Sequence, residues 1–315
     1  MKRKNRPAGQ CLRQGFYARG EQIMNCATLE QAINHHLQTT KNATYCNQAG
    51  QSMFTSATVC VQRGNHPKFA ALKNHIPHHL TPEELFQNDY PDAERSSLNV
   101  VCIALHFAES IVRDNAKASF YPSDSWYELS YHVDYMLQAP LVPQSPFSEF
   151  LRDIFSGYRV VFPINSSIYR VEQVTPMLRR ANWSERHVAY IGGLGSFGLH
   201  GSLITEKGCA CRLINIVTDC PFPAEEYRTV NEDYNYNCLY FQKGVCRQCQ
   251  KRCPVDSIVG DDHLVERCYG HEYVASCDHA KDRFGAAITA CALCLCGVPC
   301  SFTNPMSQLQ KTAAI

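Results

Sequence analysis

The sequence predicts an α/β (α+β) protein that ends in a small, cysteine-rich, metal-binding domain. Apolar β-branched runs alternate with segments of helical periodicity, which is typical of an α/β core. The cysteines predict the metal-binding domain, because thirteen of the 18 in this 315-residue chain fall between Cys209 and Cys300. A chain of this length buries a large core without disulfides, so the crowding indicates another role for the thiols.

The expected elements follow from apolar patterning. Strands are expected at three apolar runs, residues 98–107, 158–164 and 212–222. Helices are expected at three segments with apolar side chains at helical spacing, residues 29–37, 125–138 and 145–155. Gly157 follows the last of these helices as a candidate C-cap.

Composition narrows the class of protein. The apolar share of 45%, the charged share of 19% and the net charge of +1 are typical of a globular chain and give no strong nucleic-acid signal. The basic start, MKRKNR, is expected to be a solvated terminus or a weak contact with an acidic partner. No apolar signal segment follows it and no run of eighteen apolar residues occurs, so we expect no membrane span and a reducing, cytoplasmic location.

The most specific motif is Cys246-x2-Cys249-x3-Cys253-Pro254. Bacterial ferredoxins carry C-x2-C-x2-C-x3-C-P, in which the last cysteine binds the other of two clusters. Lys243 stands where the first cysteine of that motif is expected, and Cys238 is the nearest replacement. The loop from Cys238 to Cys246 is short enough to close on one metal centre at little entropic cost.

Ten cysteines from Cys238 to Cys300 suffice for two [4Fe–4S] clusters, which need about eight thiolates. The crossed ligation of ferredoxins gives a first cluster held by Cys238, Cys246, Cys249 and Cys300. It gives a second cluster held by Cys253, Cys268, Cys291 and Cys294. Cys277 and Cys296 remain contested, with Cys296 a substitute for Cys294 or Cys300.

Other uses of these thiols stay open. Paired C-x2-C knuckles also hold structural zinc, and disulfides are a further alternative. The C-x3-C-P turn followed by Ile258 favours iron–sulfur, since zinc knuckles lack it. Cys209, Cys211 and Cys220 are interpreted as small hydrophobic residues or surface thiols, because C-A-C is too tight for two ligands of one cluster.

Several segments together resemble a known family. NWSERH, then GLG-x-x-G, a strand ending in T-D, C-x2-C-x3-C-P and G-V-P-C occur in this order over about residues 98–302. The chain resembles the epoxyqueuosine reductase and corrinoid reductive dehalogenase superfamily, especially its short reductase-like iron–sulfur proteins. The resemblance implies a nitroreductase-like α/β core that holds cobalamin and a ferredoxin-like domain with two [4Fe–4S] clusters. It also implies a ferredoxin or flavodoxin as electron donor and a small-molecule or modified-nucleoside substrate.

With the resemblance, four regions are expected: an N-terminal polar and helical extension at 1–65, a corrinoid-binding-like α/β domain at 66–230, a ferredoxin-like domain at 231–305 and a tail at 306–315. The glycine segment supplies the candidate cofactor-binding residues, Gly193, Gly195, Ser196, Gly198, His200 and Gly201. The alternatives for this segment are a tight strand–turn–helix corner and a dinucleotide site.

The proton donor is not apparent from the sequence. The epoxyqueuosine reductases place an aspartate upstream of a Glu-Arg pair; if that pair matches Glu185-Arg186, the aspartate position falls near Arg179, where no carboxylate stands. The remaining catalytic candidates are His187, Tyr190 and Glu185, each with a purely structural alternative.

We therefore expect an iron–sulfur oxidoreductase that passes low-potential electrons through two clusters to cobalamin or to a substrate in a glycine-lined cleft. The first alternative is a ferredoxin-like electron-transfer protein, or an activator of another protein's corrinoid, without a small-molecule substrate. The second is a zinc-stabilised interaction module.

Overall fold

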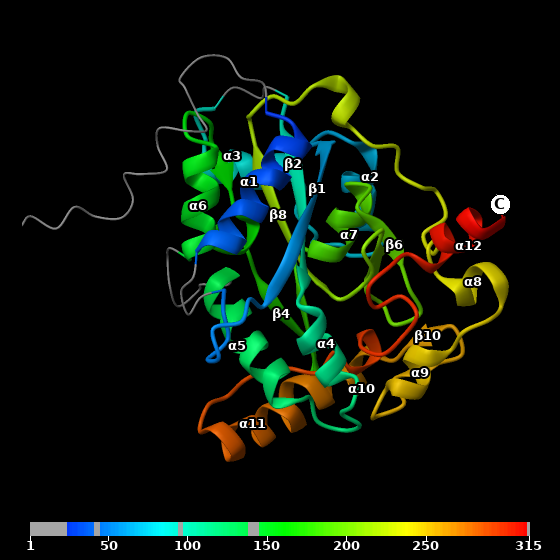
Figure 1. Cartoon of the computed structure of the whole chain (residues 1–315). Helices are drawn as coiled ribbons and strands as arrows, with labels where there is room; N and C mark the ends of the chain where they lie inside the picture. The colour runs from blue at the N-terminus through cyan, green and yellow to red at the C-terminus, as the bar shows by residue number, and fades with distance from the viewer. Residues whose placement is uncertain (1–23, 41–44, 94–96, 138–144, 314–315) are drawn as a thin grey trace, which may run out of the picture.

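The computed structural model describes residues 24–40, 45–93, 97–137 and 145–313. Its centre is an antiparallel four-stranded sheet in the order β1–β2–β8–β3 (Figure 1). These strands are β1 (Phe54–Arg63), β2 (Asn99–Phe107), β8 (Cys211–Thr218) and β3 (Val160–Val161). The fold is thus a mixed α/β architecture, as the sequence predicts.

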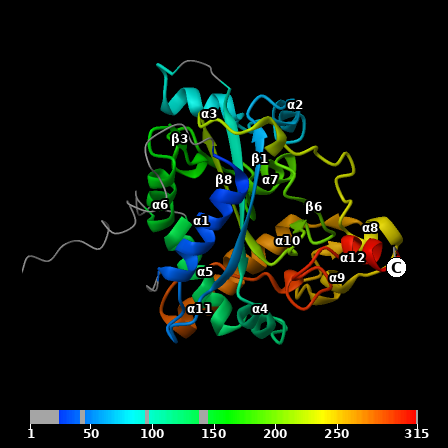
Figure 2. The ribbon, with the colours of Figure 1, turned by 45° about the horizontal axis from the view of Figure 1, so that its top comes forward.

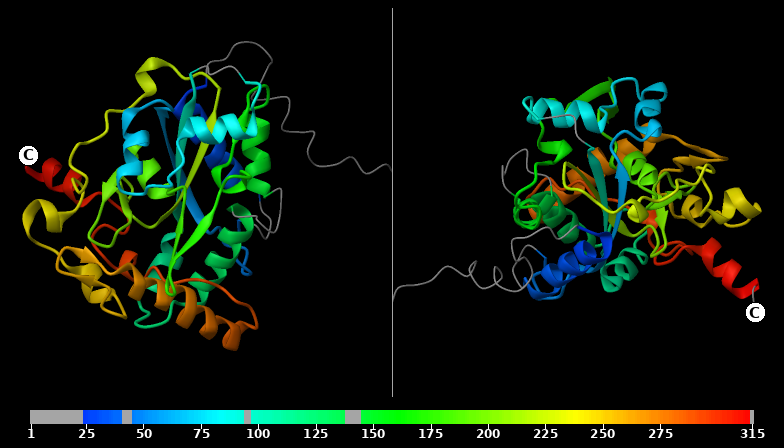
Figure 3. Two further views of the ribbon diagram at one scale, coloured as in Figure 1. Left: turned by 180° about the vertical axis from the view of Figure 1, so that it is seen from behind. Right: turned by 90° about the horizontal axis from the view of Figure 1, so that it is seen from above.

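Helices cover both faces of the sheet, as Figure 2 and Figure 3 show. One face carries α1 (Cys26–Thr39), α5 (Asp124–Leu137) and α6 (Pro146–Ile154), and the other carries α2 (Pro67–Ala71), α3 (Pro82–Asp89) and α7 (Glu185–Ile191). Alternate side chains of β2 enter the two cores, Val101 and Ile103 on the first face and Val100 and Cys102 on the second. Every residue of β2 is therefore buried.

Most predicted elements are confirmed. The helices expected at 29–37, 125–138 and 145–155 are α1, α5 and α6, and the strands expected at 98–107 and 212–222 are β2 and β8. The strand expected at 158–164 is only the two-residue β3, because Pro163 begins a 3₁₀ turn at Pro163–Asn165.

The N-terminal boundary at residue 65 divides elements that pack together. Strand β1 lies inside the predicted extension, yet it pairs along its length with β2. Leu29 and Ile33 of α1 are fully buried in the same core. The sheet therefore begins before that boundary, and the MKRKNR start lies outside the described residues. The predicted tail at 306–315 contains most of α12 (Pro305–Ala313).

The cysteine-rich segment is built from short elements, α8 (Leu239–Lys243), α9 (Gln248–Arg252), β9 (Ile258–Val259), β10 (Asp262–His263), α10 (Val265–Tyr269), a π-helical stretch Gly270–Ala275, α11 (Ser276–Phe284) and a 3₁₀ turn Leu293–Leu295. It lies along one end of the central sheet (Figure 1). Ala280 and Ile288 join the same buried cluster as α5, and the Tyr127 hydroxyl lies 2.7 Å from Ser276 Oγ. The two predicted domains therefore share core contacts.

The smaller elements complete the fold: α4 (Glu109–Asn115), β4 (Val171–Thr175), β5 (Leu178–Ala181), β6 (Gly195–Phe197), β7 (Leu203–Thr205) and 3₁₀ turns at Leu72–Asn74 and Ala224–Glu226. In the part of the chain that the structure describes, no helix is both long and apolar enough to cross a bilayer.

Candidate functional site

The four cysteines predicted for the first cluster line one pocket. Cys238 caps α8, Cys249 lies on α9, and Cys246 and Cys300 come from loops. The pocket spans about 330 Å³, part of which is open solvent, and apolar side chains such as Leu199 and Val298 complete its wall. We call these four thiols the first cysteine group.

The second cysteine group comprises Cys253, Cys268, Cys291 and Cys294, the four predicted for the second cluster. The pKa of Cys268 and that of Cys291 are raised to about 12, chiefly by burial and to a smaller extent by Glu272 and other cysteines of the group. Burial and then the neighbouring thiols raise the pKa of Cys294 well above its usual value. Bringing four thiols together away from water is unfavourable for free thiolates and is offset when a metal centre binds them.

Backbone N–H groups face several of these sulfurs. The pKa of Cys238 is raised by burial, while N–H groups of Phe241, Leu199 and Tyr240 act to lower it. Ser257 donates its N–H to Cys253 Sγ at 3.2 Å. Such N–H···S contacts stabilise negative sulfur, so the donor set fits thiolate ligands of iron–sulfur clusters.

The contested cysteines lie differently. Cys296 is fully buried, and its Sγ accepts a hydrogen bond from Asn115 Nδ2 at 3.5 Å. Cys277 lies on α11 and is half-buried. Sequence reasoning gave Cys209 no ligand role, but this fully buried residue has its Sγ 3.8 Å from Cys300 Sγ. No local pattern signals this contact, because it depends on a backbone pairing in which Cys209 N–H donates to Cys300 O.

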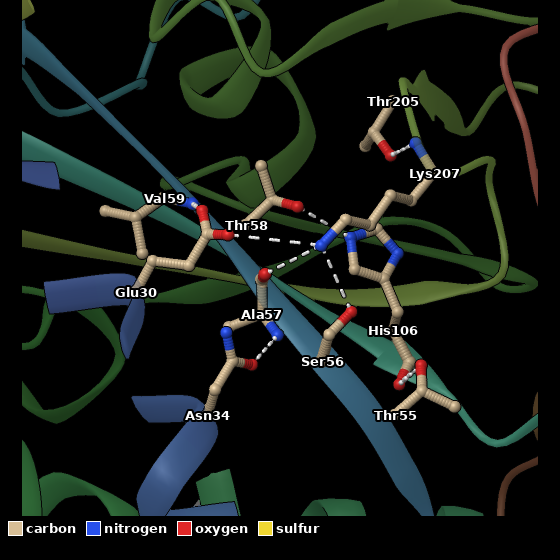
Figure 4. Close-up of polar contacts among 10 residues, drawn as sticks. All are labelled: Glu30, Asn34, Thr55, Ser56, Ala57, Thr58, Val59, His106, Thr205 and Lys207. Carbon is tan, nitrogen blue, oxygen red and sulfur yellow. Dashed lines mark hydrogen bonds and ion pairs between the residues drawn. The ribbon is translucent and has the colours of Figure 1, made fainter. Parts of the chain in front are cut away.

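The segment that carries Cys209 is anchored on both sides. Lys207 Nζ reaches Ser56 Oγ and Ala57 O of β1, each at 3.3 Å (Figure 4). Gly208 has φ +89°, and a Cβ there would overlap the Ser301 carbonyl oxygen and lie 2.6 Å from Phe302 N. Only glycine therefore lets this segment lie against the chain around Cys300.

Gly208→Ala is expected to destabilise the protein more than Gly157→Ala. Gly157 has a similar φ of +100° and no atom near its missing Cβ, so alanine there costs only about 1–2 kcal/mol of backbone strain. The overlap at Gly208 adds about 2–3 kcal/mol. Thermal unfolding midpoints at one scan rate measure the difference, and equal midpoints would show that the two segments do not touch.

Along the glycine segment, other protein atoms occupy the positions where the glycines would carry a Cβ. A Cβ at Gly193 would lie 2.9 Å from Arg228 Cβ, and one at Gly201 would lie 2.7 Å from His263 Nδ1. A Cβ at Gly195 would overlap the backbone of Ile204. Ser196 Oγ accepts the N–H of Asn237 at 2.7 Å. These contacts are those of a tight corner, and the cofactor-binding role of the segment stays a prediction.

Two of the three catalytic candidates are engaged in structural contacts. His187 Nδ1 lies 2.7 Å from Ser184 Oγ, and its Nε2 lies 3.2 Å from the Tyr234 hydroxyl. Burial lowers the pKa of His187 to about 4, so its ring is neutral at pH 7 and lacks the proton of a general acid. The Tyr190 hydroxyl donates to the carbonyl oxygen of Asn231.

Glu185, the third candidate, lines a second pocket with Arg212, Asn215 and the rings of Phe147 and Phe162; the pocket spans about 380 Å³, part of which is open solvent. Within the described part of the protein, Glu185 Oε2, Arg212 Nε and Asn215 Oδ1 have no hydrogen-bonding partner. Burial raises the pKa of Glu185 to about 8, and it outweighs the Arg212 guanidinium and the N–H of Asn215. The carboxyl group therefore holds a proton at pH 7.

The second pocket and the second cysteine group are linked through the start of α7. Arg186 follows Glu185 in α7, and its charge acts to lower the pKa of Cys268. Arg186 also donates a hydrogen bond to the Gly201 carbonyl at 3.3 Å. The same helical turn therefore carries a protonated carboxyl group and a cation that acts on a candidate ligand.

Solved structures of epoxyqueuosine reductase are similar to this chain at low sequence identity. A selenomethionine-labelled epoxyqueuosine reductase has a TM-score of 0.42 at 16% identity. The Bacillus subtilis enzyme with its catalytic loop swung out, and an epoxyqueuosine reductase with an epoxyqueuosine-modified tRNA-Tyr stem loop, each have a TM-score of 0.39 at 15% identity. Each match covers 86% of this chain and 64% of the other, so this chain spans less than two thirds of their length. No protein-family model and no curated protein matches the sequence.

Proposed function

We propose that this chain is an iron–sulfur oxidoreductase, related to epoxyqueuosine reductase, that passes low-potential electrons through two [4Fe–4S] clusters to cobalamin or to a substrate. The observation that supports the proposal is the pocket lined by Cys238, Cys246, Cys249 and Cys300. Cys253, Cys268 and Cys291 lie near enough to Cys294 to raise its pKa, which supports the second group. When bound, such clusters supply single electrons at low potential.

The Glu185 pocket holds the proposed proton donor. Its unpartnered oxygen and nitrogen atoms favour water or a polar group of a substrate, since a buried polar group without a partner costs free energy. Phe147 and Phe162 supply an apolar wall. Glu185, protonated at pH 7, supplies the proton that reduction of a substrate consumes.

The second candidate function is electron transfer without a small-molecule substrate, as in an activator of another protein's corrinoid. The packing of Gly193, Gly195 and Gly201 favours this second function. Protein atoms already fill the space beside each glycine where a side chain would stand, so a cofactor cannot occupy that space. In both functions a reduced ferredoxin or flavodoxin is the proposed electron donor.

Metal analysis of anaerobically purified protein tests the proposal. We expect about eight irons and eight sulfides per chain. Fewer than about six irons would contradict two clusters, and a colourless zinc protein would replace the proposal with a zinc-stabilised module. Cobalt that co-elutes with the protein after incubation with cobalamin supports cobalamin as the electron acceptor. Its absence leaves direct reduction of a substrate and the electron-transfer protein.

A further inference from the structure

His200 lies against the candidate ligand Cys300. It stands in the turn between β6 and β7 and is only 3% exposed. Its Nε2 lies 3.6 Å from Cys300 Sγ, which is a contact within the range of an N–H···S hydrogen bond. His200 also lines the pocket of the first cysteine group.

The hydrogen-bond network assigns the proton of this ring. Ser202 donates its backbone N–H to His200 Nδ1 at 3.0 Å, so Nδ1 is an acceptor and carries no hydrogen. The neutral ring then has its hydrogen on Nε2, the nitrogen that faces Cys300. A nitrogen that carries a hydrogen cannot bind a metal, so His200 is a donor to the sulfur although His200, Cys209 and Cys300 lie close enough together for a metal site.

Gly198 makes room for this ring. A Cβ at Gly198 would lie 2.7 Å from His200 Nε2 and 2.8 Å from Cε1, closer than atoms pack. Gly198 is not in the left-handed backbone region, so alanine there is obstructed by side chains, those of His200 and Ile204, and not by backbone strain. The His200 ring therefore explains why the last position of the G-L-G-x-x-G segment, Gly198, is a glycine.

We propose that His200 is a positioning residue that donates a hydrogen bond to Cys300 and raises the reduction potential of the cluster that Cys300 helps to hold. The inference rests on the proposed function. A donor to a ligand sulfur favours the reduced state, because that state carries more negative charge. Cys209, 3.8 Å from the same sulfur, is placed to act alongside it.

Redox titration of the anaerobic protein, followed by electron paramagnetic resonance, tests this role. We expect His200→Leu to keep its full iron content and to lower the midpoint potential of one cluster while the other is unchanged. His200→Gln, which keeps an N–H donor, is expected to recover part of the shift. Gly198→Ala is expected to shift the same cluster in the same direction, because it displaces the ring.

A double-substitution cycle separates this effect from general damage. In the His200→Leu background, Gly198→Ala is expected to add no further shift, since the donor is already gone. Unchanged potentials, or additive shifts, would overturn the proposal. Loss of iron from His200→Leu would also overturn it, because it would make His200 a ligand. A wild-type protein without iron would instead refute the proposed function itself.

Discussion

Cys238→Ala and Cys268→Ala are each expected to remove one cluster and leave the other. Cys238 belongs to the first cysteine group and Cys268 to the second, so the two substitutions act on different centres. Each thiolate supplies about a quarter of the bonds that hold a cluster, and a three-ligand site loses iron. We expect iron to fall from about eight toward four per chain in each variant and to near zero in the double variant.

Cys277→Ala is the matched control for this pair of substitutions. Cys277, like Cys268, is half-buried in the cysteine-rich segment, and it lies on α11 and belongs to neither group. The control is therefore expected to keep both clusters. If Cys238→Ala keeps full iron while Cys277→Ala loses it, the assignment of the first ligand to Cys238 in place of the missing cysteine at Lys243 is wrong.

Glu185→Gln is expected to change how stability depends on pH. Burial raises the pKa of Glu185 to about 8, while the unfolded chain has an ordinary carboxyl pKa near 4.3. Between these values the native protein binds the additional proton, so its free energy of unfolding falls as pH rises. Glutamine cannot ionise, so the free energy of unfolding of the variant rises relative to that of the wild type by up to about 5 kcal/mol between pH 4 and pH 9.

Thermal unfolding of both proteins across this pH range measures the effect. The difference in midpoint between variant and wild type is expected to grow by several degrees as pH rises, and cluster loss common to both proteins cancels in the difference. Glu172→Gln, at an exposed position of β4, is expected to show no such trend. Parallel curves for Glu185→Gln and the wild type would mean that Glu185 is already ionised at pH 7, and would remove it as a proton donor.

The sequence determined the parts of this protein that depend on local pattern. The apolar run of β2 and the helical spacing of α5 and α6 predicted those elements, because period and burial are written in neighbouring residues. Spacing also divided eight of the ten cysteines of 238–300 into two sets of four. The four cysteines of the first set line one pocket, and the assignment of both sets as ligands stays a prediction.

Only the tertiary structure decided what depends on contacts between distant segments. Strand β1 joined the core through pairing with β2, although the surrounding residues read as a polar extension. Cys209 and His200 came to lie beside Cys300, about a hundred residues further along the chain. Burial turned Glu185 into a protonated carboxyl group and His187 into a neutral ring. A pKa is set by the solvent and charges around a group, and these follow from the fold and not from adjacent residues.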